Sequence, residues 1–153
     1  KVTSRGFDVE IGGEVLPSWQ LSAAYTFNTT KDKTTNAVFS SITPKHLFKP
    51  SSVYRLPGYW NAWRVGANAH VQSAHYITGT AVNGGVSTPY QFTQPGYAVV
   101  GAMLQYQLDP RWQVTLNINN LFDRTYWRTV GTTFSGNVYA APRNAMLTLR
   151  GTF

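Results

Sequence analysis

The sequence of 153 residues contains no cysteine, and only 12% of its residues are charged. The lack of cysteine excludes disulfide bridges, thiolate zinc sites and thiol nucleophiles. The low charge, together with an aromatic content of 14%, excludes a disordered chain, which would be rich in charge and poor in aromatic residues. No run of about 18 apolar residues occurs, so a transmembrane helix is excluded as well.

Motifs for catalysis and for metal binding are also missing. No Ser-His-acid grouping, glycine-rich phosphate loop or metal-ligand spacing stands out. If His70 and His75 lie on one strand, their spacing puts them on opposite faces, which disfavours a shared metal ion. We therefore expect no catalytic residues, no metal site and no cofactor, and predict that the protein is not an enzyme. The net charge is +7, but the basic residues are scattered singly, so nucleic-acid binding is not expected. Anionic lipid or an acidic ligand would also suit this charge.

The feature that dominates the sequence is an alternation of apolar and polar residues, which is the pattern of β-strands. Seven segments carry this alternation or a weaker form of it. Most are about 9 to 12 residues long, whereas strands of about 5 to 6 residues are usual in globular proteins. The segments are residues 7–15 (with the strand reading back to Val2), 19–27, 46–56, 63–72, 97–108, 112–119 and 144–153.

The connections between these segments alternate between short and long. Residues 16–18, 57–61 and 109–111 form short connections with the Pro, Gly and Asp of tight turns. The other three connections cover about 28–44, 73–95 and 122–137, and loops of this length are usually functional or mobile. The sequence thus predicts an antiparallel sheet with all short turns at one end and all long loops at the other.

Two environments fit such a sheet: water around a soluble β-sandwich, or lipid around an outer-membrane barrel. The strand length suits a tilted bilayer crossing of about 9 to 11 residues. From Phe7 onward, the apolar faces of the alternating segments carry no Asp, Glu, Lys or Arg. Tryptophan, which prefers the membrane interface, stands beside each short turn. These residues are Trp19, Trp60, Trp63 and Trp112, with Phe153 expected at the same end. We therefore favour the barrel, although each Trp alone could plug the core of a sandwich.

Charged side chains fall on the opposite, polar faces of the strands. In a barrel these faces line a polar lumen, where the side chains would solvate the interior or hold something inside it. They are Asp8, Glu10, Glu14, Lys49, Arg55, Arg64, His70 and Arg150. Seven strands would leave open edges in lipid, which do not occur, so we expect the chain to be the C-terminal part of a larger barrel.

Several stretches resemble TonB-dependent outer-membrane receptors. NINNLFDRTYW (117–127), followed by Tyr139, Pro142-Arg143-Asn144 and a strand ending in Phe153, resembles their C-terminus. SRGFDVEIGGEVLPSWQLSAAYTF (4–27), TPKHLFKPSSVYRLPG (43–58) and QPGYAVVGAMLQYQL (94–108) resemble earlier segments in the same order. Within NINNLFDRTYW we expect the strand to end near Leu121, with Asn120 and Asp123 bonding their own backbone at the bend.

The resemblance implies an all-β fold: a transmembrane antiparallel β-barrel of 22 strands around an N-terminal plug. Residues 1–153 would supply the last seven strands, and the plug and the earlier strands are absent from this sequence. It further implies a receptor for a ferric siderophore, of the pyoverdine or hydroxamate type, in the bacterial outer membrane. Its partners would be the ferric siderophore, the TonB complex acting through the absent plug, membrane lipid and the rest of its own barrel.

The ligand would bind at the extracellular loops, where aromatic and arginine side chains suit a flat, anionic compound. The candidates by position and type are His75, Tyr76, Tyr90, Phe92, Tyr126, Trp127 and Arg128. Tyr126 and Trp127 could equally belong to an aromatic ring at the membrane surface or to ordinary β-pairing. Two alternatives stay open: a passive outer-membrane porin, and a soluble β-sandwich that binds a ligand.

Overall fold

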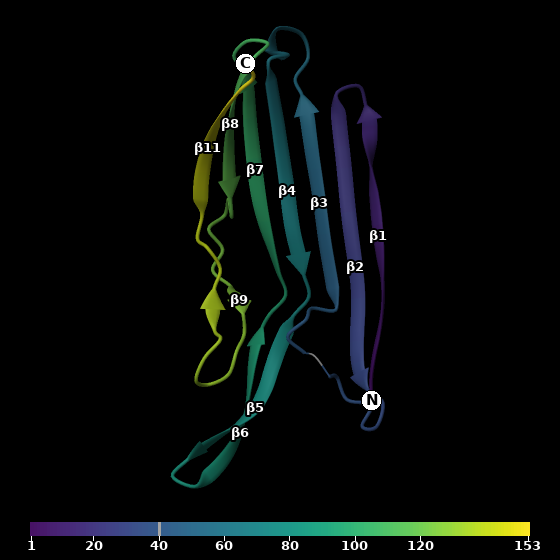
Figure 1. Ribbon diagram of the computed structural model, residues 1–153, viewed down its shortest axis with the longest axis vertical. Coiled ribbons are helices and arrows are strands. Elements are labelled where there is room, and N and C mark those ends of the chain that lie inside the picture. The colour runs from purple at the N-terminus through teal and green to yellow at the C-terminus, as the bar shows by residue number, and fades with distance from the viewer. Residues whose placement is uncertain (40) are drawn as a thin grey trace.

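The computed structural model describes residues 1–39 and 41–153; Ser40, inside the loop predicted for 28–44, lies outside the described residues. The seven predicted strands form one antiparallel sheet in the order β1-β2-β3-β4-β7-β8-β11 (Figure 1). β1 and β11 are its two edges, so the sheet is open. The strands are β1 (Val2–Leu16), β2 (Trp19–Asp32), β3 (His46–Arg55), β4 (Trp63–Gln72), β7 (Tyr97–Gln107), β8 (Trp112–Asn119) and β11 (Asn144–Gly151).

The first hairpin is longer than predicted. β2 continues to Asp32, five residues past the predicted end at Phe27, and pairs there with Val2 of β1. Thr29 and Thr30 favour this extension, because β-branched side chains suit a pleated strand. The loop expected from residue 28 onward therefore begins inside a strand.

The short connections gather at one end of the sheet, together with the C-terminus, and the long ones at the other, with the N-terminus (Figure 1). We call these the turn end and the loop end. At the turn end, Glu14 Oε1 accepts a hydrogen bond of 2.6 Å from the backbone N–H of Ser18. Asp109 Oδ1 accepts two, from the N–H groups of Arg111 and Trp112 at 2.7 and 2.9 Å. A 3-10 turn, η1 (Gly58–Trp60), joins β3 to β4.

Two of the three segments predicted as long loops contain β-hairpins, so the prediction of loops without strands is wrong there. β5 (His75–Asn83) pairs with β6 (Val86–Gln94), and β9 (Trp127–Thr129) pairs with β10 (Val138–Tyr139). The turn between β5 and β6 uses Gly84 and Gly85 at positive φ of 56° and 81°. Glycine adopts such angles without a steric cost. Figure 1 shows this hairpin projecting beyond the loop end.

The strand register joins the apolar residues of all seven strands into one continuous surface, which we call the apolar face. One row across it runs from Val65 of β4 through Leu104, Leu116 and Leu147. A second row starts at Phe7 of β1 and passes through Phe27 to His46. Because a shift of one residue would turn every side chain to the other side, this agreement over seven strands fixes the register.

The opposite surface, the polar face, carries the charged residues predicted to share it. The register places Glu10 opposite Ala24, and Ala24 opposite Lys49. Arg55 lies opposite Arg64, which lies opposite Gln105. Asp8, Glu14, His70 and Arg150 fall on the same side by their partners Thr26, Gln20, Val99 and Gln113. Hydrogen bonds run across this face from Arg64 Nη1 to Gln105 Oε1 (3.3 Å) and from Gln105 Nε2 to Thr115 Oγ1 (3.2 Å).

The apolar side chains of the sheet are not packed in an interior. Leu147 is 71% exposed and Leu149 60% exposed, while Leu116 and Ile118 are partly exposed. Among the described residues no large side chain is fully buried. A β-sandwich would cover this surface with a second sheet, so the exposure argues for lipid as its surroundings. No helix in the described part of the chain has the length and apolarity to cross a bilayer.

Aromatic pairs border the apolar face at the turn end. The predicted Trp19, Trp63 and Trp112 each lie against another ring: Tyr54 at 6.2 Å, Tyr106 at 4.5 Å and Phe153 at 5.5 Å between centroids. Trp60 lies in η1 and is exposed. Tyr54 and Tyr106 were not predicted here, because only the register shows that they stand opposite the tryptophans. The arrangement matches an aromatic ring at a membrane interface.

Candidate functional site

Buried side chains are concentrated at the loop end. The apolar ones are Tyr97 and Val130, and the polar ones are His75, Gln94 and Asn120. All five lie in or next to the β5–β6 and β9–β10 hairpins, or at the ends of β7 and β8 that adjoin them (Figure 1). The loop end therefore holds a small packed core of its own, which fixes the positions of the hairpins.

Asn120 ties the chain after β8 to the segment before β11. It lies at a positive φ of 51°, and its Oδ1 accepts a hydrogen bond from Arg124 N–H at 2.9 Å. Its Nδ2 donates to the carbonyls of Arg124 (2.9 Å) and Ala141 (3.3 Å). Asp123, also at positive φ, accepts a hydrogen bond from Arg143 N–H at 2.8 Å. The predicted local bonding at this bend is confirmed for Asn120, and the links to Ala141 and Arg143 add a long-range clamp.

A chain of hydrogen bonds links β4 to β5. Gln72 lies between two histidines, with its Oε1 3.0 Å from His70 Nε2 and its Nε2 3.0 Å from His75 Nδ1. The assumption that both histidines share one strand is therefore wrong, because β4 ends at Gln72 and β5 begins at His75. The described residues hold no group of three or more His, Cys, Asp or Glu side chains suited to a metal ion.

His75 is only 3% exposed, and its burial lowers the pKa of the imidazole below the ordinary value of 6.5. The cause is desolvation, which disfavours the charged form. With Gln72 Nε2 donating to Nδ1, the neutral ring is the form that fits this hydrogen bond. His75 thus helps to fix the root of the β5–β6 hairpin.

Gln94 holds the two hairpins together. It stands opposite His75 at the root of β5–β6, and its Oε1 accepts a hydrogen bond from the N–H of Trp127 in β9 at 2.8 Å. The ring of Tyr126 packs on the buried ring of Tyr97, with 4.2 Å between centroids. Trp127 stacks on Tyr139 of β10 at 3.9 Å and an interplanar angle of 19°.

A cleft of about 360 Å³ opens between the two hairpins, and we call it the loop cleft. Its wall combines two aromatic rings with amide and hydroxyl groups. It is lined by Gln91, Phe92, Thr93, Trp127, Val130 and Asn137. Flat apolar surface beside a few polar groups is the usual make-up of a small-molecule site.

Of the predicted ligand-contact residues, Phe92 and Trp127 line the loop cleft. Tyr90 contacts Phe92 at 5.0 Å, and its ring lies over Gly79, where any added Cβ would collide with it. Arg128 is exposed beside Trp127 on β9. Their contact with a ligand stays a prediction.

The other three candidates are not gathered at the loop cleft. His75 is buried, and Tyr126 packs on Tyr97. Tyr76 donates its N–H to Ser41 O at 2.9 Å and lines a separate small cavity. The sequence reasoning missed Gln91, Thr93, Val130 and Asn137, which reach the cleft only through the pairing of β5 with β6 and of β9 with β10. The Asn-Gly-Gly turn between two alternating stretches was the signal that could have revealed the first hairpin.

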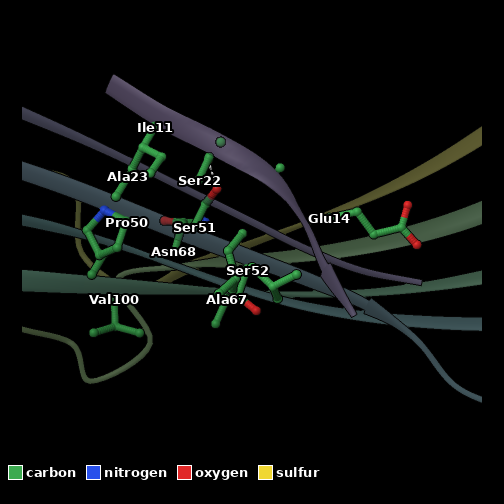
Figure 2. Close-up of a pocket in the computed structure, with 15 residues that line it drawn as sticks. Ile11, Glu14, Ser22, Ala23, Pro50, Ser51, Ser52, Ala67, Asn68 and Val100 are labelled. Carbon is green, nitrogen blue, oxygen red and sulfur yellow. Dashed lines mark hydrogen bonds between the residues drawn. The ribbon is translucent and has the colours of Figure 1, made fainter. Parts of the chain in front are cut away.

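A separate hollow lies against the β1–β4 strands of the sheet and Val100 of β7 (Figure 2). It measures about 630 Å³, and small side chains of the apolar face account for much of its wall, among them Ala23, Pro50, Ala67 and Ala69. Residues of the polar face also line it, namely Glu14, Ser22, Ser51 and Asn68. The hollow shares no lining residue with the loop cleft.

Residues 1–121 match the family described as TonB dependent receptor-like, beta-barrel. Among curated proteins, the ferric-pyoverdine M114 receptor PbuA of Pseudomonas sp. strain M114 is 35% identical over 100% of the chain, which covers 18% of that receptor. The ferripyoverdine receptor of Pseudomonas aeruginosa PAO1 is 31% identical, again over 100% of the chain and 18% of that protein. The chain therefore spans about a fifth of the length of the curated relatives it matches.

Solved structures give the same picture. The pyoverdine outer-membrane receptor FpvA of P. aeruginosa PAO1, bound to pyoverdine, superposes with a TM-score of 0.87 at 29% identity, covering 99% of this chain and 22% of that one. The ferric-catecholate import receptor Fiu of Escherichia coli K12 superposes with a TM-score of 0.75 at 26% identity, covering 97% and 20%. All four of these proteins are named as receptors, and FpvA is named as an outer-membrane receptor.

Proposed function

Because the chain belongs to the family of TonB-dependent receptor β-barrels, we propose that its parent protein takes up a ferric siderophore of the pyoverdine type across the outer membrane. The loop end of the sheet faces the cell exterior and receives the ligand. TonB supplies the energy for passage by acting on a plug, which this chain does not contain. The remaining strands of the barrel come from the same parent protein.

The loop cleft is the observation that carries this proposal for residues 1–153. Phe92 and Trp127 offer flat rings to an aromatic group of the ligand, and Gln91 and Asn137 offer amide groups to its polar edge. Arg128 next to Trp127 adds a positive charge that suits an anionic ferric complex. The hairpins that form the cleft are held by Gln94 and the Tyr97–Tyr126 stack, so the cleft is formed before a ligand arrives.

The two alternatives are less consistent with these observations. A passive porin needs a water-filled lumen but no aromatic cleft braced at the loop end, and the curated relatives are siderophore receptors. A soluble β-sandwich needs a covered apolar face, whereas Leu147 and Leu149 are exposed. Uptake of a ferric siderophore accounts for both the lipid-facing sheet and the cleft.

Deleting the gene of the parent protein tests uptake directly. Growth under iron limitation should be lost on one ferric siderophore and should return when the intact gene is restored. Growth that persists on every siderophore supplied would contradict the proposal.

The role of the loop cleft is tested with full-length receptor carrying Trp127→Ala. Loss of a stacking ring should weaken binding of the ferric siderophore by roughly 10-fold, since such ring contacts contribute about 0.5 to 1.5 kcal/mol beyond their buried area. Trp60→Ala is the matched control, because Trp60 is an exposed ring at the turn end. Equal affinities for the two variants would remove the cleft from the proposal while leaving uptake untouched.

A further inference from the structure

Charge is segregated between the two faces of the β1–β2 hairpin. Arg5 pairs with Thr29, and Thr3 pairs with Lys31, in the same set of outward positions as the Phe7–Phe27 pair. Arg5 and Lys31 therefore lie on the apolar face and are exposed. The carboxylates of the hairpin stand at even-numbered positions, whose side chains point to the polar face: Asp8, Glu10, Glu14 and Asp32.

This placement is unusual for the sheet as a whole. Besides Asp8, Glu10, Glu14 and Asp32, its seven strands, all of which are described, carry four further Asp, Glu, Lys or Arg residues on the polar face: Lys49, Arg55, Arg64 and Arg150. Arg5 and Lys31 are the two exceptions within these strands. They are diagonal neighbours on adjacent strands, a spacing that long side chains bridge easily. Lys33 and Lys1 adjoin them, with Lys33 N–H donating to Lys1 O at 2.7 Å.

An aromatic layer marks the depth of this cationic pair in the membrane. Phe7 lies 5.7 Å from Phe27 and 5.9 Å from Tyr25, and Phe27 lies 5.2 Å from His46. Tyr25 Oη and His46 Nδ1 are 2.7 Å apart. Tyr25 and His46 are the amphipathic rings of this layer, and such rings settle at the level of lipid headgroups. The layer is therefore the counterpart of the aromatic pairs at the turn end.

Arg5 stands two residues beyond Phe7, and Lys31 four residues beyond Phe27. At about 3.4 Å per residue these steps are roughly 7 and 14 Å along the strand, and less in depth once the strand is tilted. The headgroup layer adds about 5 to 7 Å to each side of the hydrocarbon core. Arg5 thus falls within it, and the flexible stem of Lys31 lets its ammonium group reach it.

We propose that the outward face of β1–β2 at the loop end is a binding site for the phosphate groups of lipid headgroups in the adjoining leaflet. The guanidinium of Arg5 can hold a phosphate with two parallel hydrogen bonds, and Lys31 adds a mobile point charge. The carboxylates that would repel a phosphate face the other way. This site depends on the membrane setting of the sheet and not on the identity of the siderophore.

The test uses the full-length receptor in nanodiscs of phosphatidylcholine containing phosphatidic acid, with retained lipid counted by native mass spectrometry. The double variant Arg5→Gln, Lys31→Gln should retain phosphatidic acid roughly 30-fold more weakly, since each cation near an anionic surface contributes about fivefold. The matched control, Lys49→Gln with Arg55→Gln, removes the same charge from the polar face and should behave as wild type. Raised salt should weaken retention in wild type.

Several results would overturn the site. Equal retention by wild type and the double variant would do so, as would an equal loss in the control. Retention of a fatty acid as strong as that of phosphatidic acid would show that charge alone acts, without phosphate recognition. Displacement of the lipid by dissolved inorganic phosphate would show a site for the free ion rather than for a headgroup. If the double variant does not fold, the single variants take its place, with about fivefold expected for each.

Discussion

The sheet and the loop end of this chain are stabilised in different ways. In the sheet, the side chains of the apolar face stay exposed or partly exposed. The strands are held by a backbone ladder whose register shifts in the β1–β2 hairpin between Glu14 and Leu16. At the loop end, a few buried polar side chains make specific hydrogen bonds, as Asn120, Gln94 and His75 do. The sheet therefore depends on its surroundings, while the loop end carries its own small core.

The difference follows from the two solvents. In lipid there is no gain from packing apolar side chains against each other, so the outward positions need only be apolar. In water, the hairpins beyond the sheet must bury something and must satisfy every polar group that they bury. One consequence is that the sheet tolerates exchange of one apolar residue for another, whereas the loop end depends on particular residues.

The largest effect is expected from placing a charge on the apolar face. Leu147→Arg puts a guanidinium on the outward side of β11, where a charge costs about 2 to 4 kcal/mol near the bilayer midplane. Thr148→Arg, one residue along on the polar face, should cost far less. The measurement is the free energy of unfolding of the full-length barrel in lipid bilayers. Similar losses for the two variants would contradict the assignment of lipid to the apolar face.

The second prediction concerns the clamp at Asn120. Asn120→Ala removes three hydrogen bonds from a buried position and leaves alanine at a positive φ. We expect the segment 121–143 to open about 2 kcal/mol more easily, or roughly 30-fold more often. Hydrogen exchange of the amides in this segment measures the opening.

Asn119→Ala is the control for this experiment. Asn119 is exposed and donates one side-chain hydrogen bond, to Asn144 Oδ1 at 3.0 Å. Its loss should change the exchange of residues 121–143 little. If both variants opened the segment to the same degree, the clamp would not be specific to Asn120.

The sheet could be predicted from the sequence because alternation is a local signal. Trp63, Val65 and Ala67 reveal the outward side of β4 without reference to any other strand, and turn residues such as Pro110 mark where strands meet. Strand number, order and polarity followed from such patterns. The end of β2 was misjudged because a threonine-rich stretch reads equally well as a loop or as a strand.

The loop end was harder to predict because its contacts join residues far apart in the sequence. Nothing local indicates that Gln94 accepts a hydrogen bond from Trp127, or that Asp123 accepts one from Arg143. Phe92 and Trp127, which were chosen by residue type, line the loop cleft, whereas Val130 and Asn137 beside them carry no chemical signal of their own. Polar clamps of this kind are visible only once the chain is folded.

The smallest expected effect is a pH dependence at the root of the β5–β6 hairpin. Burial lowers the pKa of His75, so the native state favours the neutral ring. The stabilisation is fully present above pH 6.5, the ordinary pKa of histidine, and is lost progressively as the pH falls below that value.

Exchange of the amides in β5, corrected for the intrinsic rate at each pH, should therefore speed up on acidification in wild type. His75→Gln keeps a neutral side chain at every pH and should abolish this dependence, while His46→Gln, at an exposed histidine, should preserve it. A pH dependence that survives His75→Gln would contradict the assignment of this effect to His75.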